Sequence, residues 1–129
     1  MQIAPKYSNL IGEIADFFEQ KIALAKELGA KKLVLDVGIG FGKTAEQNLL
    51  LIKHLEHFLK FDYPLLVGAS RKSVINHYYP SEVKDRLPGS LYLHLKAFEN
   101  GAQIIRTHDV AEHKQLFNMY EAMKQTTLW

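Results

Sequence analysis

The sequence predicts an α/β fold in which parallel strands alternate with helices. Three short apolar runs, spaced about 35 residues apart, each end in charged or hydroxyl residues, at 32–36, 64–72 and 103–109. The segments between them carry apolar residues at helical spacing. This pattern is typical of successive βα units, whose functional side chains gather at the carboxyl ends of the strands.

The first predicted helix begins at a Ser8-Asn9 cap and ends at Gly29, because glycine is common just past a helix end. Its apolar stripe consists of residues three and four apart: Ile11, Ile14, Phe18, Ile22 and Ala25. The first strand follows, and its apolar run 33–35 is expected to be buried on both faces.

The second predicted helix begins at a capping box formed by Thr44 and Gln47. Pro64 then opens the second strand, where its missing N–H is tolerated. A short helical turn is expected between Ser81 and Arg86. The expected buried stripe of the second helix is Leu51, Leu55, Phe58 and Leu59.

The third main helix is predicted from Ser90 to Asn100, with Gly101 as its stop signal. In the third strand, Ile104, Arg106 and His108 are expected to alternate onto one face. A final helix is expected to begin at a second capping box, formed by Asp109 and Glu112. Its expected inner face consists of Leu116, Tyr120 and Met123.

Length and composition limit the domain organisation and the partners. A barrel of eight βα units needs roughly 250 residues, so 129 residues with 47% hydrophobic content suit one structural unit within a larger barrel. A helix with no strand before it also favours a part of a larger domain. The net charge of +2 is too small for a nucleic-acid footprint, and there is no cysteine for disulfides or thiolate metal sites. No apolar stretch approaches 18 residues, so we expect no membrane partner and a cytoplasmic location.

Cationic and hydroxyl side chains end the second and third runs. They are Ser70, Arg71, Lys72, Ser73, Arg106 and His108. Because adjacent parallel strands lie about 5 Å apart, these groups would share one anion pocket if the strands are neighbours. Asp36, which ends the first run, could serve as a turn residue, or it could pair with Lys72 and accept hydrogen bonds from a ligand ring.

The segment 38–44, Gly-Ile-Gly-Phe-Gly-Lys-Thr, follows a strand and opens a helix, as phosphate-binding loops do. A nucleotide P-loop needs four residues between its first glycine and the terminal Gly-Lys-Thr, and here there are three. Val37 stands where that glycine belongs. Nucleotide binding is therefore the third alternative, and a tight turn explains some of the glycines but not Phe41. The histidines at 54, 57, 77 and 94 show no metal-ligand pattern and are expected to be solvated or structural.

Three motifs in order resemble the dihydropteroate synthase family, the folate-pathway enzymes that sulfonamide drugs inhibit. They are LDVGIGFGKT at 35–44 with Asn48, LVGASRKS at 66–73, and Gly101-Ala102 with IRTHDV at 105–110. The resemblance implies part of a (β/α)8 TIM barrel, namely strands six to eight and a preceding helix. Residues 1–129 would then be the C-terminal part of a pterin-binding barrel domain. The family commonly has proline where this chain has Val37.

The resemblance also implies a reaction and its site residues. The family condenses 6-hydroxymethyl-dihydropterin diphosphate with p-aminobenzoate and releases diphosphate. The catalytic pair would be Asp36, which binds the pterin and stabilises developing positive charge, and Lys72, which contacts the pterin and Asp36. Arg106 and His108 would hold the diphosphate, near the Ser70 hydroxyl. The p-aminobenzoate side would be lined by Phe41, Gly68, Arg71 and Ser73.

Three further expectations follow from the resemblance and from the incomplete barrel. The ligands of Mg²⁺ are expected in the first five strands, outside this sequence, so no metal ligand is assigned here. The isolated chain is expected not to catalyse the condensation at a useful rate. It is also expected to form a homo-oligomer, through an open strand edge or through late helices with Leu95, Phe98, Leu116 and Tyr120. The alternative function is a non-catalytic assembly or interaction module derived from the barrel.

Overall fold

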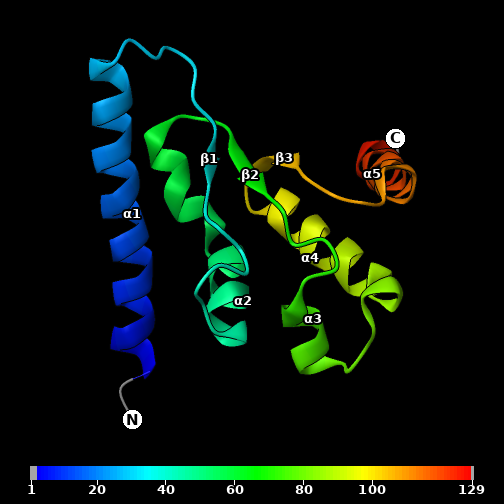
Figure 1. Ribbon diagram of the computed structural model, residues 1–129. Helices are drawn as coiled ribbons and strands as arrows, with labels where there is room; N and C mark the ends of the chain where they lie inside the picture. Colours follow the sequence, from blue (N-terminus) through cyan, green and yellow to red (C-terminus); the bar gives the residue numbers. More distant parts are fainter. Residues whose placement is uncertain (1–2, 129) are drawn as a thin grey trace.

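The computed structural model describes residues 3–128, with side chains from residue 9 onward. Its centre is a three-stranded parallel sheet in the order β1-β2-β3 (Figure 1). The strands are β1 (Leu35–Asp36), β2 (Leu65–Val67) and β3 (Ala102–Ile105). The helices are α1 (Ile3–Glu27), α2 (Ala45–Lys53), α3 (Ser73–Tyr78), α4 (Leu87–Glu99) and α5 (Val110–Gln125), with 3-10 helices η1 (Leu55–Phe61) and η2 (Val83–Asp85).

The two faces of the sheet have opposite character. Leu35 pairs with Leu65, and Asp36 pairs with Leu66, so alternate side chains point to opposite faces. A register shift between Leu65 and Leu66 aligns Leu66 with Ile104. One face is buried under the helices, and it consists of Leu35, Leu65, Val67 and Ala102. The opposite face carries Asp36 and Ile104, which are exposed.

Helix α1 packs its apolar stripe against this core. Phe18 is buried and meets Phe58 and Phe61 edge-to-face, with ring centroids 5.6 and 5.9 Å apart. Ile11, Ile14 and Ile22 pack against the core and are partly buried, and Ala25 is partly buried too, which confirms the predicted stripe. The predicted start at Ser8-Asn9 is wrong, because the helix begins at Ile3. Pro5 lies in the first turn, where a missing N–H costs no helical hydrogen bond.

Three predicted burials are wrong. Val34 is 50% exposed because it lies just before the two-residue strand β1, at an open hollow between α1 and β1. Leu59 is exposed because the expected second helix changes at Leu55 to the tighter turn of η1, which rotates its apolar stripe. Met123 is 74% exposed near the end of α5.

Several boundaries also differ from the sequence prediction. Helix α3 was not expected, and α4 begins at Leu87, three residues before Ser90, with Pro88 in its first turn. The expected turn before Arg86 is present as η2, and Pro64 directly precedes β2. Strand β3 ends at Ile105, so the expected alternation of Arg106 and His108 along a strand is wrong. Among the described residues, no helix is both long enough and apolar enough to cross a bilayer.

Candidate functional site

The predicted convergence of charged groups is confirmed at the carboxyl ends of the strands. Arg106 Nη1 lies 3.2 Å from Asp36 Oδ2, although 70 residues separate them in the sequence. Ser70 Oγ lies 2.7 Å from His108 Nδ1, which joins the loops after β2 and β3. Parallel strands with the same polarity place these loops at one edge of the sheet.

The Arg106 guanidinium lies against the backbone of Gly68. A Cβ atom at Gly68 would stand 2.6 Å from Nη2 and 2.9 Å from Cζ of Arg106, so only glycine leaves room for this packing. The expected pairing of Asp36 with Lys72 is wrong, because the Asp36 carboxylate is occupied by Arg106 and by the Gly38 N–H at 2.9 Å. The site thus places one carboxylate directly beside one guanidinium.

A cavity of about 170 Å³ lies between the loops after β2 and β3. Most of its polar groups are hydrogen-bond donors or cations, which suits an anionic ligand. Its lining residues are Gly68, Ser70, Lys72, Arg106, Thr107 and His108. We call this space the anion cavity. It unites five of the residues that the sequence assigned to the site from the second and third runs, namely Gly68, Ser70, Lys72, Arg106 and His108.

The hydrogen bonds of Ser70 orient the His108 ring. Ser70 is 6% exposed, and its hydroxyl accepts from the His108 N–H at 3.1 Å and from the Thr107 hydroxyl at 3.3 Å. A hydroxyl has two acceptor lone pairs and one hydrogen, so the Ser70 hydrogen goes to His108 Nδ1. The neutral ring then carries its proton on Nε2, where it can donate to an anion.

Arg71 turns away from the anion cavity, contrary to the expected shared cluster with Lys72. Its backbone has φ of 56°, a left-handed conformation that is rare outside glycine. The Ser90 hydroxyl accepts its N–H at 2.8 Å, and Arg86 donates to its carbonyl at 3.0 Å. Its guanidinium pairs with Asp109 at 2.6 Å, which lowers the pKa of that carboxyl. Asp109 is the N-cap residue of α5, as predicted, but the predicted capping box does not form, because the Asp109 carboxylate pairs with Arg71 and makes no capping hydrogen bond.

Lys72 reaches across to the loop that follows β1. Its ammonium donates to the Ile39 carbonyl and lies 4.6 Å from the centre of the Phe41 ring. Burial lowers the pKa of Lys72, and the positive charge of Arg106 lowers it further, whereas Asp36 raises it. This contact accounts for Phe41, whose ring otherwise lies exposed in a loop of small residues.

The loop after β1 closes on itself rather than cradling a phosphate with its lysine. Lys43 Nζ donates to the carbonyls of Gly38 and Phe41 at 2.8 and 3.0 Å. Three of its glycines have positive φ, as a tight turn requires. The predicted capping box is confirmed: Thr44 Oγ1 accepts the Gln47 N–H at 3.1 Å, and the Gln47 side chain accepts the Thr44 N–H at 3.0 Å.

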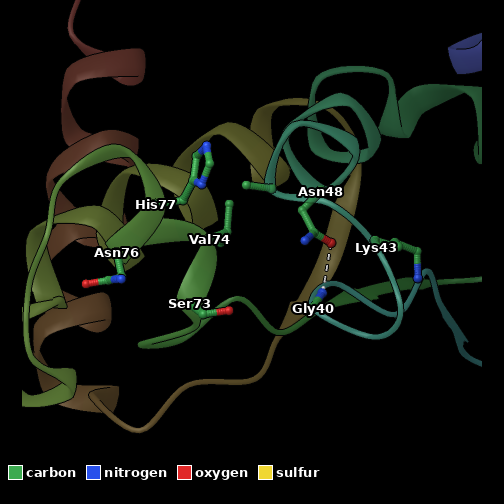
Figure 2. A pocket seen from close by; sticks show the side chains of 8 residues that line it. Gly40, Lys43, Asn48, Ser73, Val74, Asn76 and His77 are labelled. Carbon is green, nitrogen blue, oxygen red and sulfur yellow. Dashed lines mark hydrogen bonds between the residues drawn. The ribbon is translucent and has the colours of Figure 1, made fainter.

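A second cavity, of about 300 Å³, lies between this loop and α3 (Figure 2). In it, Asn48 Oδ1 accepts the Gly40 N–H at 2.8 Å, so α2 holds the loop in place. Ser73 lines this second cavity and not the anion cavity, which separates it from Lys72. Asn76 and His77 also line it, and nothing in their local sequence indicated this.

Sequence reasoning missed the buried polar residues behind the loops. Ser90 and His94 are fully buried on α4, and His113 is buried on α5. The only signal available was a polar residue within an apolar helical pattern, which does not reveal its partner. Among residues 3–128 there is no group of three or more His, Cys, Asp or Glu side chains that could hold a metal ion.

A parallel α/β sheet with cationic and hydroxyl side chains at the carboxyl ends of its strands is the arrangement in which α/β proteins bind small anionic ligands. Residues 1–108 match the family model described as pterin binding enzyme. The chain belongs to this pterin-binding enzyme family.

Relatives and solved structures agree with this assignment. The chain is 48% identical to the bifunctional dihydropteroate synthase/dihydropteroate reductase of Helicobacter pylori, over 93% of this chain and 32% of that protein. It superposes on dihydropteroate synthase from Stenotrophomonas maltophilia with a TM-score of 0.90 and 33% identity, over 98% of this chain and 49% of that one. The Xanthomonas albilineans enzyme in complex with 7,8-dihydropteroate gives a TM-score of 0.88 at 32% identity, over 92% and 46%. The chain thus spans half or less of the length of each.

Proposed function

We propose that this chain supplies the strand-end site of a dihydropteroate synthase. The reaction joins 6-hydroxymethyl-dihydropterin diphosphate to p-aminobenzoate and releases diphosphate, as a step of folate biosynthesis. The observation that carries the proposal is the Asp36–Arg106 pair at 3.2 Å beside the anion cavity. In this arrangement the Asp36 carboxylate, which suits a pterin ring, lies next to cationic donors that suit the diphosphate leaving group. The family match and the neighbour that binds 7,8-dihydropteroate support the same assignment.

The chemistry requires charge separation, and the residues suit it. The bond from the pterin methylene carbon to the diphosphate oxygen breaks, and its electron pair leaves with diphosphate. The aniline nitrogen of p-aminobenzoate forms the new bond to the methylene carbon and gives up one proton. Asp36 would bind the ring and stabilise positive charge as it develops, while Arg106 and His108 would hold the departing diphosphate. Lys72 would contact the pterin from the facing loop.

The p-aminobenzoate side of the proposed site is formed by Phe41 and Ser73, with Gly68 and Arg71 nearby. In this structure the Arg71 guanidinium is paired with Asp109, and Ser73 lines the second cavity. The exposed Phe41 ring under Lys72 suits stacking on an aromatic acid.

The proposal includes the position of these units in a barrel. We infer that β1, β2 and β3 are strands six, seven and eight of a (β/α)8 barrel, with the exposed sheet face directed to its interior. The neighbouring structures support this, because the chain covers about half of each. Among the described residues, no group of three or more His, Cys, Asp or Glu side chains could hold Mg²⁺, and its ligands are expected in the first five strands. The cytoplasmic location stays a prediction.

Titration calorimetry with diphosphate tests the proposal directly. The chain should bind diphosphate, and Arg106→Met should weaken binding by about 100-fold, because a charge-assisted hydrogen-bond donor is lost. Lys84 is exposed and does not line the anion cavity. Lys84→Met therefore also removes one positive charge but should leave the affinity for diphosphate unchanged. Equal affinity in the chain and in Arg106→Met would refute the assignment of the anion cavity.

Activity tests the whole-protein part of the proposal. We expect no useful turnover by the chain alone, because walls that orient two substrates contribute roughly 7 to 11 kcal/mol to such reactions. Adding a polypeptide that carries the other five strands of a relative should restore formation of dihydropteroate. A rate by the chain alone that matches a full-length relative would contradict this expectation.

The alternative, a non-catalytic assembly module, is favoured by one observation. An apolar hollow of about 280 Å³ lies between α1 and β1, and Phe17 and Val34 on its rim are about half exposed. Homo-oligomer formation stays a prediction, through this edge or through the late helices. Of the late-helix residues, Phe98 already packs on Tyr120 within the chain, with ring centroids 5.4 Å apart. Sedimentation of a monomer at micromolar concentration would contradict self-association.

A further inference from the structure

Two buried histidines lie behind the loops that form the anion cavity. His94 of α4 is fully buried, and His113 of α5 is 4% exposed. Their rings are joined by a hydrogen bond of 2.7 Å between His94 Nδ1 and His113 Nε2. Neither ring is part of the cavity lining, so any effect on a ligand must act through the residues that they hold.

Backbone groups at both ends of this pair fix its ring protons. The Ala69 N–H donates to His94 Nε2 at 2.9 Å, so that nitrogen carries no proton and the ring proton lies on Nδ1. His94 Nδ1–H therefore donates to His113 Nε2. At the other end, His113 Nδ1 lies 2.8 Å from the Asp109 carbonyl oxygen, which can only accept. Both rings are therefore neutral, each with its proton on Nδ1.

Each end of the pair is attached to one loop of the anion cavity. Ala69 directly precedes Ser70, whose hydroxyl holds the His108 ring. Asp109 directly follows His108, and its N–H donates to the Thr107 hydroxyl at 3.1 Å. The chain of hydrogen bonds thus runs from the loop after β2, through two helices, to the loop after β3.

We propose that His94 and His113 are positioning residues that hold the two loops of the anion cavity in register, and that a second proton on His94 releases them. A proton on His94 Nε2 would face the Ala69 N–H, so an accepted hydrogen bond would become a contact between two donors. The inference rests on the proposed function only for the identity of the anion, diphosphate.

The surroundings of His94 also disfavour a second proton on its ring, as the hydrogen-bond geometry does. Burial, the neighbouring His113 and the ammonium of Lys72 lower the pKa of His94 to about 4. The carboxylate of Asp109, at the start of α5, is paired with Arg71 and not with either ring. His94 is therefore neutral at pH 7 and takes up a second proton only in acid.

The first experiment needs no ligand. Long-range ¹H–¹⁵N spectra of the 129-residue chain at pH 7 should show protonated Nδ1 and unprotonated Nε2 for both His94 and His113. Exposed His54 serves as the reference ring. A proton on Nε2 of either buried ring at pH 7 would overturn the proposed relay.

The second experiment separates positioning from general stability. In His94→Leu, amide hydrogen exchange at His108 and Asp109 should become at least tenfold faster, while the Phe18 amide in α1 keeps its rate. Equal acceleration at all three amides would mean global destabilisation and would overturn the positioning role. If His94→Leu does not fold, His94→Gln, which can still accept from Ala69 but offers no ring for the relay, decides by the same measurement.

Ligand binding completes the test. Diphosphate affinity at pH 7 should fall about tenfold in His94→Leu and stay unchanged in the surface control His54→Gln. An unchanged affinity in His94→Leu, with normal binding by the unmodified chain, would contradict the proposal. If the unmodified chain does not bind diphosphate, the proposed function fails, and the spectra and exchange rates alone decide the relay.

Discussion

The loops after β2 and β3 are joined to each other by the Arg71–Asp109 ion pair and are held from the interior by buried, uncharged groups, whereas the loop after β1 is held largely by lysines. The Ser90 hydroxyl and the rings of His94 and His113 lie behind the loops after β2 and β3, and all three residues are buried. In the loop after β1, the carbonyls of Gly38, Ile39 and Phe41 accept hydrogen bonds from Lys43 and Lys72. From the protein interior, buried Asn48 accepts a hydrogen bond from the Gly40 N–H of this loop.

This difference matters because the two kinds of contact respond differently to water. Hydrogen bonds between buried neutral groups cannot be replaced by solvent without exposing both partners. A lysine that lies partly exposed can exchange a carbonyl for water at little cost. We infer that the anion cavity between the loops after β2 and β3 is rigid, while the loop after β1, on the side proposed for the aromatic substrate, can adjust.

Acid should damage the rigid side most. Because the folded chain lowers the pKa of His94 from 6.5 to about 4, the unfolded chain binds the extra proton first as pH falls. The stability is fully present above pH 6.5 and is lost toward pH 4, by about 3 kcal/mol. Urea unfolding from pH 7.5 to 4 should show this slope, and His94→Gln should flatten it. An unchanged slope in that variant would assign the acid sensitivity to other groups.

Asn48→Ala should destabilise the chain by about 2 kcal/mol, because it removes the hydrogen bonds to the Gly40 N–H and to the Thr44 carbonyl. Urea unfolding measures the loss. Exposed Asn118→Ala on α5 is the matched control and should change stability by less than about 0.5 kcal/mol. Equal losses would show that Asn48 does not anchor the loop.

Gly68→Ala should reduce diphosphate affinity by about tenfold, because the added methyl would displace the Arg106 guanidinium. Gly12→Ala in α1 meets nothing within 4 Å and should leave affinity unchanged. Calorimetry compares the two variants. Full affinity in Gly68→Ala would mean that Arg106 need not lie where the structure places it.

Lys72→Met should destabilise the fold least, by less than about 1 kcal/mol, because water can replace its partly exposed contacts with the Ile39 carbonyl and the Phe41 ring. It should nevertheless weaken pterin binding, since Lys72 faces the proposed ring site. Lys21→Met, which removes a similar contact over Phe17 outside the site, should match its stability and spare pterin binding. A stability loss above about 2 kcal/mol would show that the loop after β1 is as rigid as the other two.

The sequence by itself determined the local features of this protein. Apolar runs and helical spacing predicted three strands with helices between them, and the Thr44–Gln47 capping box formed as predicted. The motifs at the strand ends predicted that Asp36, Lys72, Arg106 and His108 would gather at one end of the sheet. These features depend on periodicity and on contacts within one turn, which a short segment encodes without help from the rest of the chain.

Only the tertiary structure decided which partner each polar group found. Asp36 could have paired with Lys72, and it pairs with Arg106 because β2 places Gly68 directly under that guanidinium. Asp109 matched a helix cap, yet Arg71 reaches it first. The relay of His94 and His113 spans three segments that are distant in sequence. Such pairings depend on how strands and helices stack, because a buried donor must be satisfied by whichever acceptor the packing brings within 3 Å or so.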